Sequence, residues 1–430
     1  MVEQITLIGA GPSGLLLAHY LLQQYPGYQV RIYERRRDPR QVEFSKARTY
    51  PLTLNTRGMD ALQQVEGLAE AVRAIAPEMR GSVMHPQKGK PKARTRTQPL
   101  FALDRTQLAI ALLDELTRRY SPPRLQVEFE CECQTVNFAS QTLTLQPAAV
   151  PQKTVSYEVL IGADGVNSQI RQQMSLQEGF ECETQIATNA YKSLVVALEN
   201  VPEWVDLRPG YLHSWQLATG GVVLMLDRGD GTMAGVLHFP REQRQVRDLG
   251  SVQEVLQFFQ TYCPELGAVM GEADAEAFVQ RPVSEVVSVR CNRYHQGNRV
   301  LLIGDAAHAV SPSLGQGCNA ALEDVVVFGE LLAEAQGNIR EAIAQFTVRR
   351  QADAEALLEL SNYAFPHQKR LLIEFFARQA IAKWLHSFWG GGFPPPMFQL
   401  LSDPMTPYSE ILERYRGWID RVKRVQVSGG

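Results

Sequence analysis

The stretch Ile5–Gly14, with the sequence ITLIGAGPSG, decides the fold. Its first four residues predict a short buried strand, and the glycines that follow predict a tight turn. Leucines then recur on one helical face between Pro12 and Tyr25, and Val30–Tyr33 is rich in strand-forming residues. This order of elements predicts a βαβ unit.

The turn inside this unit, Gly9–Gly14, has the GxGxxG spacing of a dinucleotide-binding motif. Gly9 permits the turn, Gly11 lets a pyrophosphate approach the backbone, and Gly14 allows the helix to pack closely on the strand. The helix N-terminus, where Ser13 lies, stabilises a phosphate by about 0.3–1 kcal/mol. These residues are therefore candidate cofactor ligands.

Glu34 stands 20 residues after Gly14, at the end of the second strand. A carboxylate is needed there to bind the ribose of a dinucleotide, so Glu34 and its neighbour Arg35 join the candidate cofactor site. The alternative is that Glu34 is a surface carboxylate paired with Arg35 or Arg36.

The composition excludes several classes of protein. With 43 Lys and Arg against 46 Asp and Glu, the net charge of the 430 residues is −3, which excludes a generally basic nucleic-acid binder. The six cysteines lack CxxC spacing, and Cys131 and Cys133 would share one strand face, so we expect a reducing compartment and no metal site. No uncharged apolar run reaches about 18 residues and the N-terminus does not resemble a signal peptide, so a cytoplasmic location is expected.

The rest of the chain predicts a second domain inserted into the first. Alternating stretches between Ala190 and Pro240 predict an antiparallel sheet. Arg299–Ile303 predicts another buried strand, and a helix follows from near Gln316 to about Ala335. The expected fold class is α/β: a discontinuous Rossmann-like domain (residues 1–180 and 290–340), a β-sheet substrate domain (181–289) and a C-terminal helical region (341–430). Part of the substrate pocket is expected near residues 70–100 of the first domain.

Two further motifs follow predicted strands. Gly162–Gly165 contains an Asp-Gly pair at Asp164, and Gly304–His308 contains a Gly-Asp pair at Asp305. A glycine-rich helix start, Gly315–Asn319, comes next.

With the three motifs in this order and spacing, the sequence resembles the group A FAD-dependent aromatic hydroxylases. The resemblance implies noncovalent FAD, with Asp305 at the ribityl chain and Arg105 toward the pyrophosphate. It places Asp164 in the same site and turns the helix start toward the pyrimidine side of the flavin. That helix start contributes the candidates Gly315, Gly317, Cys318 and Asn319. A helix N-terminus stabilises an anionic reduced flavin, which agrees with this placement.

The same resemblance implies the reaction class. The enzyme would hydroxylate a small electron-rich aromatic compound with O2, and NADPH or NADH would visit as a transient reductant because the chain has no second GxGxxG. No single side chain is assigned a catalytic role. His308 could be a general base, but a histidine packed beneath the flavin helix is the favoured interpretation.

The similarity is greatest to the kynurenine 3-monooxygenase branch and covers Arg48–Gly58, Tyr211–Trp215, Gly304–Asp324 and Leu360–Tyr363. The residues that hold the amino-acid end of kynurenine in that branch are replaced here. The Arg falls at Ser82, with Arg80 nearby, and the Tyr falls near Arg94 or Arg96. The Asn falls at Ala364 and the C-terminal Tyr near Met397 or Phe398. Candidate substrate residues are Arg80, Ser82, Arg96, Tyr191, His213, Tyr363 and Phe398. Because Ser offers one weak donor in place of a bidentate clamp, a substrate other than kynurenine is expected.

Several alternatives stay open from the sequence. The chain could be a flavin-dependent reductase or epoxidase of an isoprenoid, or a lipid- or protein-binding module without flavin. The basic run between Lys88 and Arg96 could steer an anion or be a solvated loop. The aromatic segment Leu371–Trp389 could touch a membrane surface, pack on the chain's own sheet or meet a second subunit, and we expect it to form a lid. The oligomeric state is not indicated.

Overall fold

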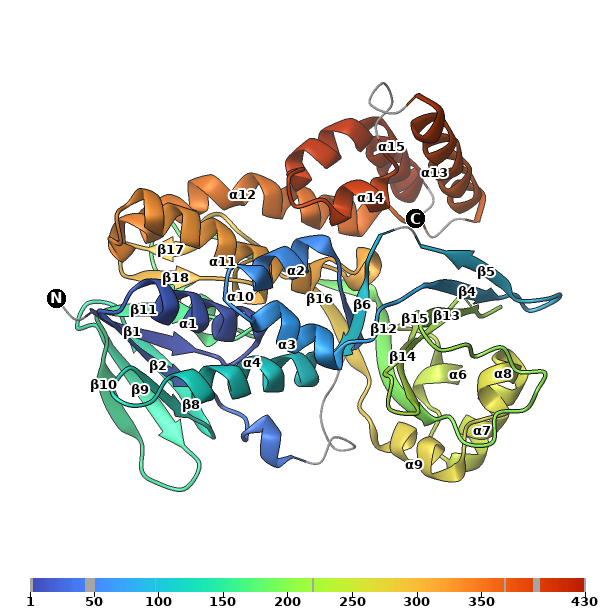
Figure 1. Ribbon diagram of the computed structural model, residues 1–430, viewed down its shortest axis with the longest axis horizontal. Coiled ribbons are helices and arrows are strands. Elements are labelled where there is room, and N and C mark those ends of the chain that lie inside the picture. The colour runs from blue at the N-terminus through green and yellow to red at the C-terminus, as the bar shows by residue number, and fades with distance from the viewer. Residues whose placement is uncertain are drawn as a thin grey trace.

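The computed structural model describes residues 3–42, 51–96, 98–218, 220–366, 369–389 and 395–428. The similarity stretch at Arg48–Tyr50 lies outside the described residues, as do residues 390–394. Figure 1 shows two sheet regions side by side, with the last helices across the top of the view.

The first sheet contains the βαβ unit that the sequence predicts. It has six strands, in the order β17 (His295–Gln296), β18 (Val300–Leu302), β11 (Val159–Gly162), β1 (Glu3–Ile8), β2 (Tyr28–Tyr33) and β7 (Leu125–Glu128). The strands are parallel except for the β17–β18 pair. Three helices pack together beside it: α1 (Pro12–Gln24), α4 (Arg105–Arg119) and α11 (Gly317–Glu334). The two of these helices that the sequence predicts, α1 and α11, form within one residue of their expected bounds.

A small antiparallel sheet lies beside β2. Its strands are β8 (Cys131–Asn137), β9 (Thr142–Pro147) and β10 (Lys153–Ser156). Cys131 and Cys133 are both buried on β8, as a shared strand face requires.

The second sheet is larger and mostly antiparallel. It has seven strands, in the order β16 (Ser284–Cys291), β12 (Cys182–Ala197), β15 (Thr232–Pro240), β14 (Val222–Asp227), β13 (Tyr211–Gln216), β4 (Gly81–His85) and β5 (Lys92–Thr95). The last two come from the region near residues 70–100, and β4 pairs with β13 in parallel.

We call the two faces of this sheet outer and inner. The outer face packs on the helices α6 (Arg244–Arg247), α7 (Val252–Tyr262), α8 (Pro264–Gly267) and α9 (Glu272–Gln280). The inner face, which includes Leu212 and Leu226, packs on the two-stranded sheet of β3 (Pro51–Leu54) and β6 (Phe101–Asp104).

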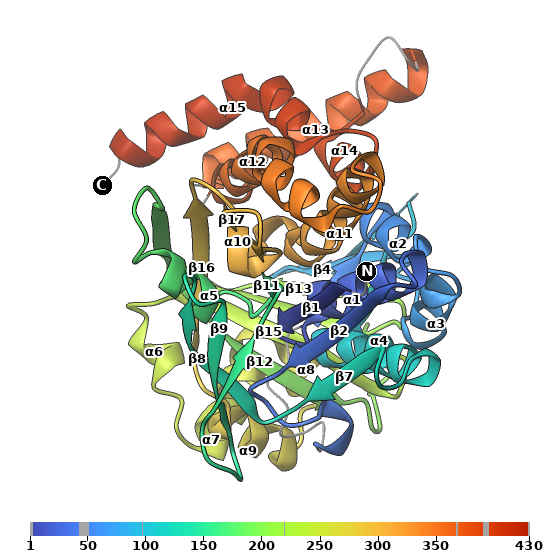
Figure 2. The same ribbon diagram turned by 90° about the vertical axis from the view of Figure 1, so that its left-hand side faces the viewer.

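The C-terminal region is helical, as predicted. Its helices are α12 (Ile339–Tyr363), α13 (Lys369–Trp389), α14 (Met397–Ser402) and α15 (Tyr408–Ser428). In both views these helices stack above α11 and α12 packs on α11 and α15 (Figure 2). The described residues also form four short α-helices, α2 (Thr56–Gln63), α3 (Leu68–Ile75), α5 (Gln169–Met174) and α10 (Asp305–His308), and two 3-10 helices at Pro39–Gln41 and Pro312–Leu314.

The predicted α/β class with a second sheet and C-terminal helices is confirmed. The division into domains at residues 180, 290 and 340 stays a proposal. No helix within the described residues is both long and apolar enough to span a bilayer.

Candidate functional site

The first glycine turn has the geometry that the motif requires. Gly9 adopts φ +105°, and a Cβ there would lie 2.5 Å from the carbonyl oxygen of Ala163. A Cβ at Gly14 would lie 2.6 Å from the carbonyl oxygen of Gly9, so helix and strand touch there. A Cβ at Gly11 would meet nothing nearer than 3.8 Å, and no side chain caps the N-terminus of α1. Within the described residues, this side of the turn is therefore open to a ligand, beside the first turn of α1, whose N–H groups have no partner inside the helix.

Glu34 lies at this turn. Its carboxylate accepts hydrogen bonds from the backbone N–H groups of Ala10 (2.8 Å) and Arg36 (2.9 Å). The first of these bonds places the carboxylate beside the glycine motif, while the Arg35 side chain is exposed. The position is the one that a ribose-binding carboxylate needs.

Arg105 and Asp164 connect the first two motifs. Arg105 begins α4, and its Nη2 lies 3.8 Å and 3.9 Å from the Cβ positions built on Gly11 and Gly165. Asp164 Oδ2 accepts from the N–H of Gln169 (2.7 Å) at the start of α5, so this carboxylate organises the loop. Burial raises the pKa of Asp164, and its Oδ1 is buried without a partner among the described residues.

Asp305 begins α10 after Gly304, whose φ is +59°. A Cβ on Gly304 would approach Ser13 Oγ to 2.8 Å, so the third motif abuts the first. Asp305 is half-buried and its side chain makes no hydrogen bond among the described residues. The pKa of Cys318 is raised to about 12, chiefly by burial and also by Asp305, while Arg105 acts in the opposite direction. The three side chains thus share one neighbourhood.

The start of α11 is held from below by Asn319. This fully buried side chain accepts from the N–H of Asn55 (3.0 Å) and donates to the carbonyls of Thr53 and Gly315 (3.0 Å each). Gly315 has φ +65°, and no side chain caps the helix at Gln316. Asn319 therefore positions the helix start with its side chain, and Gly317 lies at the uncapped first turn.

Beneath this helix lies a buried charge network that centres on Asp324. Asp324 accepts from the N–H of Gly304 (2.7 Å), from His308 Nε2 (2.8 Å) and from Arg350 Nε (2.7 Å). Burial alone would raise the pKa of Asp324, but its contacts with His308 and Arg350 outweigh burial and lower it. His308 is thus buried beneath α11, and Asp324 fixes the Gly-Asp motif from behind.

The network continues to the C-terminal helices through Glu323 and Arg57. Glu323 contacts both Arg350 (2.7 Å) and Arg57. Arg57 donates to the carbonyls of Asp403 (2.6 Å) and Thr406 (2.7 Å) and is nearly inaccessible to solvent. The segment between α14 and α15 is therefore tied to α11 through Arg57 and Glu323.

The sequence assigned no role to these charged residues. Arg57 stood within the similarity stretch Arg48–Gly58, and Glu323 and Asp324 stood at the end of Gly304–Asp324. Arg350 lies on α12 among other charged residues, and nothing in the pattern marks it as buried.

The candidate substrate residues of the second sheet divide between its two faces. Ser82 pairs with Leu212, and strand alternation places Ser82 and Tyr191 on the inner face. The N–H of Arg96 donates to the carbonyl of Arg80 (2.9 Å), which continues the β4–β5 ladder by one residue pair and puts Arg96 on the same face. Arg80 itself is exposed.

Arg96 differs from the other basic residues of this hairpin. Its side chain is half-buried, burial lowers its pKa, and its Nε has no hydrogen-bond partner among the described residues. Lys92 and Arg94, by contrast, are exposed. Arg96 is thus a desolvated cation on the inner face.

His213 lies on the outer face, away from the glycine motifs. Its side chain is fully buried, Nδ1 lies 2.9 Å from His85 Nε2 and Nε2 lies 3.1 Å from the carbonyl of Arg208. Burial lowers the pKa of His213 to about 4. Because both of its ring nitrogens have hydrogen-bond partners, we do not assign His213 a role in substrate binding.

The two C-terminal candidates lie among the last helices. Tyr363 ends α12, and Lys423 Nζ lies 5.1 Å from the centre of its ring. Phe398 on α14 packs against Phe365, with ring centres 5.6 Å apart. Ala364 is fully buried, so its position offers no polar group to a substrate beyond its backbone.

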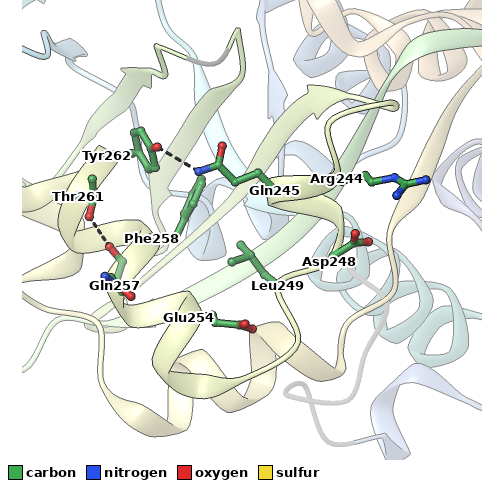
Figure 3. A pocket seen from close by; sticks show the side chains of 9 residues that line it. All are labelled: Arg244, Gln245, Asp248, Leu249, Glu254, Gln257, Phe258, Thr261 and Tyr262. Carbon is green, nitrogen blue, oxygen red and sulfur yellow. Dashed lines mark hydrogen bonds between the residues drawn. The ribbon is translucent and has the colours of Figure 1, made fainter.

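A separate hollow of about 630 Å³ lies between α6 and α7 (Figure 3). Gln245 and Tyr262 are bonded to each other across it (3.2 Å), and Phe258 lies at its base. It belongs to the helical layer beyond the outer face, remote from the glycine motifs in both overall views. We assign it no role in the reaction.

Residues 3–361 match the family model described as FAD binding domain. Kynurenine 3-monooxygenase of Sus scrofa is 29% identical and is matched over 97% of this chain and 87% of its own length. The enzyme of the same name from Salinispora tropica is 30% identical, over 99% of this chain and 94% of its own.

Two solved structures share the fold at lower identity. The tetrameric form of 2-methyl-3-hydroxypyridine-5-carboxylic acid oxygenase matches with a TM-score of 0.69 and 19% identity, over 94% of this chain and 98% of that one. PqsL of Pseudomonas aeruginosa, in complex with 2-aminobenzoylacetate, matches with a TM-score of 0.66 and 19% identity, over 87% and 99%.

Proposed function

The chain belongs to the FAD-binding domain family and is an FAD-dependent aromatic monooxygenase, and from this premise we propose that its substrate is an acidic aromatic compound other than kynurenine. The observation that carries the proposal is Arg96, a partly buried cation on the inner face whose Nε has no hydrogen-bond partner among the described residues. The sheet position of the family's Arg is occupied by Ser82, which offers one weak donor.

The residues around the glycine motifs fit FAD. The turn is open at Gly11, the Arg105 guanidinium lies beside that opening, and Asp305 has no partner of its own within the described residues. A flavin dinucleotide offers a pyrophosphate to the first two features and hydroxyl donors to the third. FAD binding also explains why the N-termini of α1 and α11 carry no side-chain caps.

We assign the binding roles accordingly. Gly9, Gly11, Gly14 and Ser13 form the pyrophosphate turn with Arg105 above it, and Glu34 binds the adenosine ribose. Asp305 accepts from the ribityl chain, and Asp164 fixes the loop between them. The first turn of α11, with Gly315, Gly317 and Cys318, supports the flavin ring edge, where the helix N-terminus favours negative charge.

FAD, when bound, takes reducing equivalents from NAD(P)H and uses O2 to oxygenate the aromatic ring. The chain itself binds, orients and excludes water. We propose that the inner face, with Ser82, Tyr191 and Arg96, orients the substrate while the segment between α14 and α15 closes the site. Since His308 is engaged by Asp324, no protein base is assigned.

The test is a substrate panel on the purified FAD-loaded enzyme. Oxygen uptake and NAD(P)H oxidation are followed with aromatic acids, their neutral amides, L-kynurenine and isoprenoids, and 18O2 incorporation is read by mass spectrometry. We expect labelled hydroxylated product from an aromatic acid and little from its amide. Labelled epoxide from an isoprenoid, with no aromatic product, would contradict the proposal.

Arg96→Gln tests the anion partner directly, with Arg94→Gln as the matched control on the same strand. Loss of a charge-assisted hydrogen bond of about 1.5–3 kcal/mol should raise KM for the acid by roughly 10- to 150-fold. The amide's KM should change little, and Arg94→Gln should resemble the wild type because Arg94 is exposed. Equal effects of both variants would show that the hairpin acts only through its overall charge.

A further inference from the structure

Two thiols meet where the chain passes between the two large sheets. Cys182 is the first residue of β12 and Cys291 the last residue of β16, and the antiparallel register makes them direct partners. Their Sγ atoms lie 3.5 Å apart. They are 109 positions apart in the chain, so only the fold brings them together.

The backbone geometry allows a covalent bond between them. Directly opposed residues of antiparallel strands have Cα atoms about 4.5–5.5 Å apart, within the range of about 4.4–6.8 Å found in disulfides. The sulfur atoms would need to approach to about 2.05 Å, a shift of about 1.5 Å. Side-chain rotation covers most of such a distance without breaking the strand pairing.

The two thiols are not equivalent. Cys182 is partly exposed, whereas Cys291 is 1% exposed. The hydrogen bond from Cys291, aided by Arg171 and Thr184, lowers the pKa of Cys182 despite its burial. The pKa of Cys291 is raised by the same contact and by burial. Cys182 is thus the accessible thiol whose thiolate is favoured, and Cys291 is the thiol behind it.

We propose that Cys182 and Cys291 form a reversible disulfide when the enzyme meets hydrogen peroxide. The Cys182 thiolate attacks one peroxide oxygen, the O–O bond breaks, and a sulfenic acid and hydroxide form. The Cys291 sulfur then attacks the Cys182 sulfur, the S–O bond breaks, and the hydroxyl leaves as water with the Cys291 proton. Two thiols are oxidised to one disulfide, and one peroxide is reduced to two waters once the hydroxide takes up a proton.

Arg171 links the position of this disulfide to the motifs that contain Asp164 and Asp305. Arg171, which faces the Cys182 thiolate, donates to the carbonyls of Val166 (2.5 Å) and Ala306 (3.0 Å). Val166 lies in the loop that carries Asp164, and Ala306 follows Asp305 in α10. The disulfide removes the negative charge beside Arg171 and fastens together the strands that enter and leave the second sheet. Oxidation of Cys182 and Cys291 therefore affects both motifs through the side chain of Arg171.

The experiment uses the reduced, FAD-loaded enzyme. After graded hydrogen peroxide, thiols are blocked, the protein is digested, and peptides are identified by mass spectrometry. We expect one peptide pair joined through Cys182 and Cys291, lost on treatment with dithiothreitol. Cys291→Ser should stop at the sulfenic acid of Cys182, trapped by dimedone, and Cys263→Ser is the matched control because that buried thiol lies apart, in the outer helical layer.

Three results would overturn the proposal. In the first, Cys182 and Cys291 both stay unmodified at peroxide doses that oxidise free glutathione. In the second, either cysteine forms a disulfide with a different cysteine of the chain. In the third, a non-reducing gel shows a disulfide between two chains. If Cys291→Ser does not fold, dimedone added to the wild type during oxidation provides the same evidence. Labelling must then appear at Cys182 before the linked peptide and never at Cys291.

Discussion

Replacing Asp305 by Ala should weaken FAD binding without unfolding the protein. The carboxylate begins α10 and its side chain makes no hydrogen bond among the described residues, so its removal breaks no internal bond there. A charge-assisted hydrogen bond to a flavin hydroxyl contributes about 1.5–3 kcal/mol, which corresponds to a roughly 10- to 150-fold rise in Kd. The apoprotein should lose at most the roughly 0.3–1 kcal/mol that an acidic residue contributes in a first helical turn.

The assay compares FAD affinity with apoprotein stability. FAD is titrated into the apoprotein and the quenching of flavin fluorescence gives Kd, while thermal unfolding of the apoprotein gives Tm. Asp305→Asn keeps the size of the side chain and should fall between the wild type and Asp305→Ala, because the neutral amide accepts a weaker hydrogen bond.

Asp324→Asn is the contrasting control in the same region. Asp324 is fully buried and contacts Gly304, His308 and Arg350, so its charge neutralises Arg350 in the interior. Breaking a buried ion pair costs about 3–5 kcal/mol, so this variant should lower the Tm of the apoprotein strongly. The assignment of Asp305 is refuted if Asp305→Ala binds FAD within about threefold of the wild type, a difference below about 0.7 kcal/mol.

Three further outcomes are expected. L-Kynurenine should have a KM at least about tenfold above that of the best substrate in the panel, because no bidentate clamp stands at Ser82, and efficient formation of 3-hydroxykynurenine would contradict this. Arg57→Met should release the segment between α14 and α15, which is a milder change than deletion from Leu371 onward. The amount of hydrogen peroxide formed per NAD(P)H consumed should then rise while FAD stays bound. If the variant still couples NAD(P)H oxidation tightly to hydroxylation, the segment is not a lid. Burial holds the pKa of His19, His213 and His238 at about 4, against an ordinary 6.5, so the unfolded chain binds more protons and stability should fall as the pH drops from about 6.5 to 4. For His213 alone, the loss of folding stability over this pH range is up to about 3 kcal/mol. A His213→Asn variant whose Tm depends on pH as steeply as that of the wild type would contradict this prediction.

The features that sequence analysis predicted correctly depend on residues that are close together in the chain. The glycines of Gly9–Gly14 are required because a Cβ would strike a neighbouring carbonyl, and such steric limits depend on a few adjacent residues. Helical periodicity likewise determined the bounds of α1 and α11 to within one residue. The cofactor class and the α/β fold could therefore be predicted from the chain alone.

Local sequence patterns predict neither the buried charge network nor the sheet face on which a substrate candidate lies. Arg57 and Arg350 are ordinary charged residues in the sequence, and their burial depends on α2, α11, α12 and the C-terminal segment packing together. His213 and Ser82 were both candidates for the substrate, yet the strand register puts them on opposite faces of one sheet.

By itself, then, the sequence determined the strand–turn–helix opening, the order of the three motifs and the chemistry they imply, because each depends on backbone conformation within a few residues. Only the tertiary structure decided which side of the second sheet a residue faces and which charges share the interior. It also decided that Cys182 lies against Cys291. These relations depend on the register between strands and helices that are far apart in the chain, since a shift of one residue would turn every side chain to the other face.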